Sequence, residues 1–102
     1  MFGLCVRFTC KVEASAEAYD RLVAETVEAI RANEPGTLVY ASHLVEGQPL
    51  QRIFYELYRD RAAFEAHEAA SHTRRYLDER GKYLASTEVD WLTLQIGKGT
   101  GG

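Results

Sequence analysis

The 102-residue sequence predicts an α+β domain with the ferredoxin-like order βαββαβ and a four-stranded antiparallel sheet. Three observations lead to this fold class. Apolar residues alternate through the first twelve positions, a long amphipathic helix follows, and two strands joined by a short turn precede a second helical region and a last strand. In this topology the first and third strands lie at the centre of the sheet.

The first strand is expected from Phe2 to Val12, because every second residue there is apolar. That face comprises Phe2, Leu4, Val6, Phe8, Cys10 and Val12. A helix follows, with Ser15 as its predicted N-cap and its end before Pro35. Its apolar face has helical spacing and comprises Tyr19, Leu22, Val23, Thr26, Val27 and Ile30.

The middle of the chain predicts a hairpin. Thr37 to Val45 and Leu50 to Arg59 are typical of strands, and the four residues from Glu46 to Pro49 form the turn between them. Asp60 is the predicted N-cap of a helix that runs to about Ala70.

The last part of the chain predicts a further helix and a strand. Ser71 or Thr73 caps the helix, which runs to about Leu84, and Glu88 to Lys98 form the strand. We expect residues 1–98 to form a single domain and residues 99–102 to form a flexible, glycine-rich tail.

Both faces of the predicted sheet carry apolar side chains, although helices cover only one face in this topology. In the third strand Phe54 and Tyr58 face one way, and Ile53, Tyr55 and Leu57 face the other. In the last strand Trp91 faces one side of the sheet, and the other side carries Leu92, Leu94 and Ile96. Monomers rarely expose such a surface, so we predict a homodimer whose two sheets pack face to face.

Composition narrows the range of partners. A net charge of -3 gives little electrostatic support for nucleic-acid binding, and no run of residues approaches the length of a membrane span. The N-terminal residues lack the features of a signal peptide, and Cys5 and Cys10 are unsuited to bridging each other. We therefore expect a cytoplasmic protein whose partners are small molecules and a second copy of the chain.

The segment from Arg52 to His72 concentrates the reactive side chains. Glu56 lies between Phe54 and Tyr58 on one strand face, where burial among aromatic rings raises the pKa of a carboxyl group towards the range of a general base. The alternative is that Glu56 forms a structural ion pair with Arg52, Arg7 or an arginine of the partner subunit.

Three histidines are further candidates. His67 follows Phe64 by one helical turn and points towards the sheet, either as a catalytic base or as a core residue with satisfied hydrogen bonds. His72 lies at the joint of two helices, where capping or solvent exposure is the simpler interpretation, and His43 shares a strand face with Val39 and Ala41. Their spacing does not match a metal motif.

Several tyrosines and one tryptophan suit a pocket for a flat, oxygenated aromatic molecule. The predicted substrate-binding residues are Tyr58, Arg52, Phe64, His43, His72, Tyr76 and Trp91, and the predicted catalytic residues are His67 and Glu56. Because the sequence lacks the motifs GxGxxG, GxxxxGK[ST], GxSxG and CxxC, an enzyme of this kind is expected to need no conventional organic cofactor.

Three stretches resemble the antibiotic biosynthesis monooxygenase (ABM) superfamily. They are Glu34-Pro-Gly-Thr, the strand Arg52-x-Phe-Tyr-Glu-x-Tyr-Arg-Asp, and Ala63-Phe-x-x-His67 followed by Ser71-His72. The resemblance implies a dimeric α+β barrel with a small-molecule pocket between the sheet and the helices. Family members include cofactor-independent oxygenases, haem-degrading enzymes and isomerases, and the haem-degrading branch is disfavoured because the first strand lacks its Asn and Tyr58 stands where its Trp would be.

Three functions remain open from the sequence. The first is a cofactor-independent monooxygenase that uses O2 to oxidise a phenol or hydroquinone, in natural-product (polyketide) tailoring or quinone metabolism. The second is an isomerase or cyclase that moves a proton next to a carbonyl group with the same His67 and Glu56. The third is a non-catalytic, ligand-binding dimer.

Overall fold

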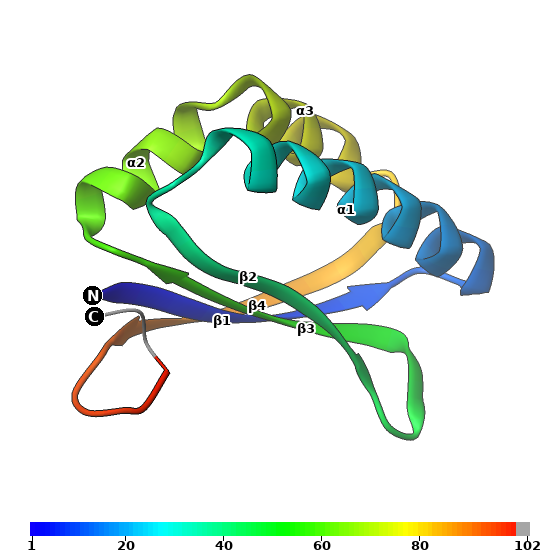
Figure 1. The fold of residues 1–102 in the computed structure, drawn as a ribbon. Helices are drawn as coiled ribbons and strands as arrows, with labels where there is room; N and C mark the ends of the chain where they lie inside the picture. The colour runs from blue at the N-terminus through cyan, green and yellow to red at the C-terminus, as the bar shows by residue number, and fades with distance from the viewer. Residues whose placement is uncertain (100–102) are drawn as a thin grey trace.

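The computed structural model describes residues 1–99, which form one sheet with helices over one of its faces (Figure 1). In chain order the elements are β1 (Phe2–Cys10), α1 (Glu13–Asn33), β2 (Thr37–Val45), β3 (Gln48–Tyr58), α2 (Arg61–Ala69), α3 (Ser71–Arg80) and β4 (Leu84–Thr93). The strand order is β2-β3-β1-β4 and all three pairings are antiparallel. The predicted α+β fold, with the first and third strands central, is confirmed.

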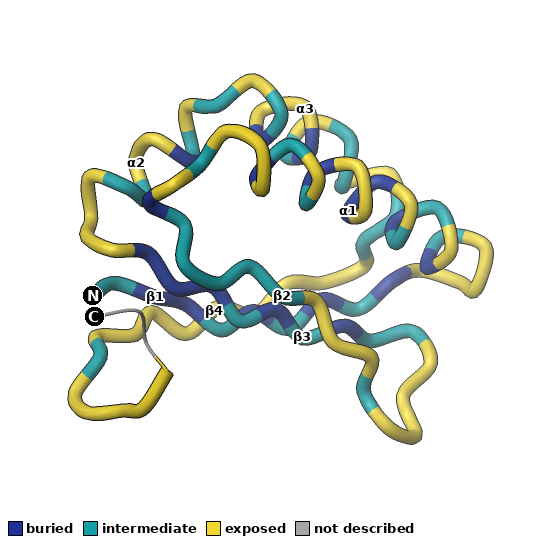
Figure 2. Tube along the Cα trace, viewed as in Figure 1, coloured by how far each residue is buried: buried dark blue, intermediate teal, exposed yellow. Residues whose placement is uncertain are grey.

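The core lies between the sheet and the helices. The even-numbered residues of β1 from Leu4 to Cys10 are buried there, as the alternation predicts, and so are the apolar positions of α1 from Tyr19 to Ile30 apart from half-buried Val27. Val12 is an exception, since it lies beyond the strand and is exposed. Figure 2 shows that buried and half-buried residues make up all of β1 and most of β3, whereas β4 is exposed along most of its length.

One helix cap agrees with the prediction and two differ. Asp60 caps α2, because its carboxylate accepts a hydrogen bond of 2.8 Å from the backbone N–H of Ala63. Ser15 lies inside α1, since the carbonyl of Val12 already accepts the first helical hydrogen bond, from Ala16. Neither Ser71 nor Thr73 caps α3, where Ala70 holds the N-cap position and offers no side-chain acceptor.

The hairpin turn is tighter than predicted. The ladder between β2 and β3 extends to the pair Val45 and Gln48, so that only Glu46 and Gly47 remain between the strands. Gly47 has φ +75°, a conformation that glycine adopts without steric cost. This backbone freedom lets two residues reverse the chain where four were expected.

The last strand begins earlier than predicted, at Leu84, and α3 ends at Arg80. β4 pairs with β1 from Cys10 opposite Leu84 to Phe2 opposite Thr93. Its length is therefore set by β1, and the predicted continuation to Lys98 has no partner strand. Leu94 and Ile96 consequently lie beyond the strand, contrary to the expected face assignment.

The face of the sheet away from the helices carries Ile53, Tyr55 and Leu57 of β3, as the alternation predicts. Leu57 is buried by its neighbours, while Ile53 and Tyr55 are half-buried and Leu92 of β4 is exposed. Cys5 and Cys10 are unbridged, in agreement with the sequence. Among residues 1–99, no helix has the length and apolar character that crossing a bilayer requires. Residues 100–102 of the predicted tail lie outside the described part of the chain.

Candidate functional site

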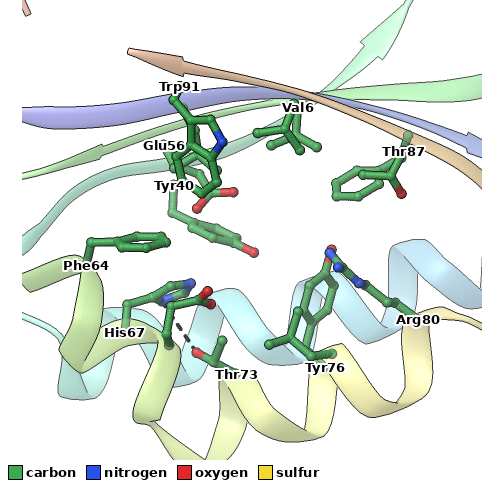
Figure 3. Close-up of a pocket in the computed structure, with 15 residues that line it drawn as sticks. Val6, Tyr40, Glu56, Phe64, His67, Thr73, Tyr76, Arg80, Thr87 and Trp91 are labelled. Atoms are coloured by element: carbon green, nitrogen blue, oxygen red, sulfur yellow. Dashed lines mark hydrogen bonds between the residues drawn. The ribbon is translucent and has the colours of Figure 1, made fainter. Parts of the chain in front are cut away.

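A cavity of about 200 Å³ lies between the helix-covered face of the sheet and helices α2 and α3 (Figure 3). Apolar and aromatic side chains make up most of its wall, and a few polar groups interrupt them. Its lining residues are Leu4, Val6, Phe8, Tyr40, Glu56, Phe64, His67, Glu68, Thr73, Tyr76, Leu77, Arg80, Thr87, Val89 and Trp91.

Four of these residues form a row across the whole sheet. Tyr40 of β2 is opposite Glu56 of β3, Glu56 is opposite Leu4 of β1, and Leu4 is opposite Trp91 of β4. Opposite residues in antiparallel strands project from the same face at about 5 Å spacing. The strand register therefore places a carboxyl group between two aromatic side chains and an aliphatic one.

Glu56 is the buried acid of this row, with only 7% of its surface exposed. Burial raises its pKa to about 7, although the Tyr58 hydroxyl opposes the shift by donating a hydrogen bond of 2.6 Å to Oε1. The predicted alternative of an ion pair with Arg52 or Arg7 is wrong. Arg52 donates two hydrogen bonds of 2.9 Å to Asp20, and Arg7 donates one of 2.6 Å to Gln51.

His67 of α2 points inward from the opposite wall and is 4% exposed. Its Nδ1 lies 2.8 Å from Oε1 of Glu34, and its ring packs between those of Tyr40 and Tyr58 at centroid distances of 5.4 and 5.3 Å. The Thr73 hydroxyl lies 3.4 Å from the same nitrogen. Among residues 1–99 no hydrogen bond engages Nε2, which is therefore the ring nitrogen available to a ligand.

Glu34 is a functional candidate that the sequence interpretation did not single out. Burial alone would raise its pKa, but hydrogen bonds from Thr37, His72 and His67 outweigh that effect and hold the pKa below its ordinary value. Thr37 donates at 2.6 Å, and His72 contacts the other carboxylate oxygen through Nε2. Because Glu34 is ionised, His67 donates its Nδ1–H to it, and in the neutral imidazole the lone pair therefore lies on Nε2.

Of the other predicted site residues, three line the cavity and the rest do not. Phe64, Tyr76 and Trp91 line the cavity, and Trp91 stands at its exposed side with 61% of its surface accessible. Tyr58 lies behind Glu56 and is fully buried.

The remaining predicted residues do not line this cavity. His72 lines a neighbouring cavity of about 310 Å³, which Glu34 and His67 also border. Arg52 is held by Asp20, and His43 is exposed beside Ile53, whose carbonyl lies 3.0 Å from its Nδ1.

The end of the cavity formed by α3 holds Arg80, which the sequence interpretation did not single out. It lies beside a pair of tyrosine hydroxyls. The hydroxyls of Tyr76 and Tyr19 share a hydrogen bond of 2.6 Å. Beside them the guanidinium of Arg80 packs against the rings of Phe8 and Tyr76, at 5.7 and 5.6 Å from the centroids. Arg80 follows Tyr76 by four residues on the same face of α3, and this helical spacing was the signal that could have identified it.

Comparison with known proteins identifies related folds. The sequence model described as "Antibiotic biosynthesis monooxygenase" matches residues 1–79. Comparison with curated proteins gave no match.

Solved structures match over almost the whole chain. A protein of Pseudomonas aeruginosa is 26% identical with a TM-score of 0.83, covering 93% of this chain and 94% of its own. Proteins of Bacteroides thetaiotaomicron and Caulobacter crescentus, which are described by the same family name, are 24% and 20% identical with TM-scores of 0.85 and 0.86. Each of these two matches covers 93% of this chain and 90% of the other.

Proposed function

Because the chain belongs to the antibiotic biosynthesis monooxygenase family, we propose that it is an oxidoreductase that oxidises a phenol or hydroquinone with O2. The observation that carries this proposal is the position of His67. Its free Nε2 faces an aromatic-lined cavity while its Nδ1 is anchored to an ionised carboxylate. This is the arrangement of a general base with a fixed tautomer.

The size of the cavity limits the substrate. An apolar protein cavity of about 150 Å³ holds a benzene molecule. The volume of about 200 Å³ found here suits one aromatic ring with one or two small substituents. Since Trp91 leaves one side open to solvent, a substituent of the ring has an exit there. We therefore favour single-ring substrates over fused polyketide rings that lie wholly inside the cavity.

In the proposed reaction Nε2 of His67 removes the phenolic proton. The phenolate gives one electron to O2, and the resulting phenoxyl radical and superoxide combine to form a carbon–oxygen bond. The ring hydroperoxide then loses water and becomes a quinone. One atom of O2 enters the new carbonyl group, the other leaves in water, and the substrate supplies all the electrons.

Glu56 serves this chemistry as the second proton carrier. A pKa of about 7 means that protonated and ionised forms coexist near neutral pH, so the group can accept a proton at one step and return it at another. The protonated form can also donate a hydrogen bond to oxygen as negative charge develops there.

Oxygen uptake tests the proposal. With single-ring hydroquinones, the protein should consume O2 above the heat-inactivated background, and ¹⁸O2 should label the quinone product. His67→Ala and Glu56→Gln should lower the rate by about 10²–10⁴-fold, the usual contribution of a positioned acid or base. The matched control is His43→Ala, which alters an exposed histidine away from the cavity. Anaerobic turnover at an undiminished rate would contradict the proposal.

A second candidate function follows from the pKa of Glu56. A buried carboxyl group with a pKa of about 7, in the same cavity as His67, also suits removal and return of a proton next to a carbonyl group. An isomerase or cyclase of this kind would incorporate solvent deuterium into its product without oxygen uptake. If neither chemistry occurs and both variants bind ligands normally, a non-catalytic binding protein is the better description.

We also propose that the protein is a homodimer formed by the sheet faces away from the helices. The support is the apolar character of Ile53, Tyr55 and Leu92 on that face. Sedimentation equilibrium should give twice the monomer mass, and Tyr55→Lys should shift the population to monomers. A monomer at all concentrations would overturn this assembly.

A further inference from the structure

The two ends of the cavity differ in charge. Glu56 and His67 lie at one end, and Arg80 lies at the other, beside Tyr76 and Thr87 (Figure 3). We propose that Arg80 binds a carboxylate substituent of the ligand and that the substrates are aromatic acids. This inference rests on the proposed function only in assuming that the cavity holds the ligand. It does not depend on the oxygen chemistry.

Arg80 is the last residue of α3, and aromatic rings fix its position. Its guanidinium carbon lies 5.7 Å from the ring centroid of Phe8 and 5.6 Å from that of Tyr76. Contacts of this kind hold a guanidinium group in place while leaving its N–H groups free to donate. The side chain is half-buried and is the one arginine among the residues that line the cavity.

Within residues 1–99 no carboxylate lies within 4 Å of Arg80, whereas Arg31, Arg52 and Arg59 each have one and Arg75 has two. The C-terminal end of α3 stabilises the charge in part, since helix carbonyls concentrate negative potential there. These carbonyl groups do not provide a hydrogen-bond acceptor on the side of Arg80 that faces the cavity. One N–H of Arg80 donates to the Tyr76 hydroxyl. An arginine whose remaining donors face a cavity without an acceptor for them is matched best by an anion.

Hydroxyl groups beside Arg80 complete a donor site. The Tyr76 hydroxyl is buried and shares its hydrogen bond with Tyr19. When Tyr19 donates in that bond, the proton of Tyr76 remains free for a ligand. Thr87 of β4 lines the same end of the cavity, and its hydroxyl provides another donor.

The opposite end disfavours a carboxylate. Glu56 and Glu68 both line the cavity, and the negative charge of Glu68 contributes to the raised pKa of Glu56. A carboxylate placed there would meet like charge. A ring with a carboxylate at one end and a hydroxyl at the other is therefore oriented with its hydroxyl towards His67, and a cavity of about 200 Å³ accommodates such a molecule.

The inference is tested by ligand binding under nitrogen, so that no oxidation takes place. The probes are 2,5-dihydroxybenzoate and its methyl ester, which differ in the negative charge. Trp91 is the sole tryptophan of the chain and lines the cavity, so its fluorescence reports occupancy, and calorimetry supplies an independent Kd. We expect the acid to bind at least about tenfold more tightly than the ester, as a charge-assisted, bidentate hydrogen bond predicts.

Substitutions assign that preference to Arg80. Arg80→Gln should weaken binding of the acid about 10- to 100-fold and leave binding of the ester within about twofold. Arg80→Lys, which keeps the charge but loses the bidentate geometry, should give an intermediate loss. The control Arg74→Gln removes the same charge from an exposed position of α3 and should change neither Kd. Thermal unfolding of each variant shows whether it remains folded.

Two outcomes overturn the inference, namely equal binding of acid and ester by the unaltered protein, or an acid preference that persists in a folded Arg80→Gln variant. Failure of the proposed oxidation gives a different pattern. An Arg80-dependent preference for the acid without oxygen uptake supports this inference and contradicts the oxygenase. Oxidation of the acid by Arg80→Gln with an unchanged rate and KM supports the oxygenase and contradicts the carboxylate site.

Discussion

The carboxyl groups of Glu34 and Glu56 are both shielded from solvent, since the Glu34 side chain is 8% exposed in a half-buried residue and Glu56 as a whole is 7% exposed. Their pKa values nevertheless move in opposite directions. Burial raises the pKa of both. Glu34 receives hydrogen bonds from Thr37, His67 and His72, which reverse the shift. Glu56 receives one hydrogen bond, from Tyr58, and keeps a raised pKa. The three donors to Glu34 and the deeper burial of Glu56 together decide which carboxyl group is ionised.

The comparison assigns the two groups different tasks. A carboxylate that is ionised at neutral pH is suited to anchoring a histidine, as Glu34 does for His67. A carboxyl group that titrates near pH 7 is suited to moving protons, as proposed for Glu56. Four substitutions test this division.

The largest loss of stability is expected from Glu34→Gln. The amide cannot serve as the charged acceptor of both His67 and His72, so the tautomer of His67 is no longer fixed. We expect the rate of hydroquinone oxidation to fall about 10- to 100-fold and the free energy of unfolding to fall by about 3 kcal/mol. Urea unfolding and oxygen uptake measure the two effects.

The matched control for that substitution is Glu28→Gln, on the exposed surface of α1, where the charge pairs with exposed Arg31. It should change stability by less than about 0.5 kcal/mol and leave the rate unchanged. Equal effects of the two substitutions would show that Glu34 has no special role.

The next largest change in the free energy of unfolding is expected from Glu56→Gln, which should stabilise the fold rather than destabilise it. The folded-state pKa of about 7 lies above the ordinary value of 4.5, so the folded state binds the proton more tightly than the unfolded state. Stability from this group is therefore greatest below pH 4.5 and is lost as the pH rises to about 7. The difference corresponds to at most about 3 kcal/mol.

Glu56→Gln should accordingly stabilise the fold at pH 8 by up to about 3 kcal/mol and have little effect near pH 4.5. Urea unfolding curves across this range measure the difference. A destabilisation at pH 8 would mean that Glu56 is ionised and well stabilised in the fold, like Glu34.

Tyr58→Phe should sharpen the contrast by removing the hydrogen-bond donor of Glu56. The ionised form loses its partner, so the pKa of Glu56 should rise further above 7, and stability at pH 8 should fall by about 1 to 2 kcal/mol. NMR titration of the carboxyl carbon measures the pKa. Tyr55→Phe, on the opposite face of the same strand, provides the control and should leave that titration unchanged.

The smallest effect is expected from Thr37→Val, which removes one of the three donors to Glu34. The pKa of Glu34 should move upward towards its ordinary value, and stability at neutral pH should fall by about 1 kcal/mol. Because a lowered pKa stabilises the fold only above that pKa, the deficit should disappear as acid protonates Glu34. A constant deficit at every pH would instead indicate lost packing.

The site was predictable from the sequence where local periodicity decides the orientation of a side chain. Alternation in β3 placed Glu56 on the helix-covered face, and helical spacing turned His67 inward with Phe64. Periodicity does not show which distant group a side chain meets. Glu34 follows the end of α1, and its histidine partners come from α2 and α3.

The boundaries of α3 and β4 were predicted wrongly because they too depend on contacts between distant parts of the chain. Glu88 to Lys98 has the composition of a strand, but β4 begins at Leu84 because its pairing with β1 sets its limits. The early end of α3 at Arg80 follows from the same constraint, since the chain must enter the sheet soon afterwards. Arg52 was expected in the pocket because it lies on the correct face, but Asp20 of α1 binds it at the other end of that face.

The row of Tyr40, Glu56, Leu4 and Trp91 implies that the cavity can bind a ligand only after β4 has paired with the rest of the sheet. β4 supplies one wall of the cavity and pairs only with β1, from the other end of the described chain. Contacts between such distant segments form slowly, and an edge strand is among the first elements to detach. A ligand that contacts Trp91 binds only those protein molecules in which β4 is paired with β1. Ligand binding should therefore slow amide hydrogen exchange in β4 more than in central β3.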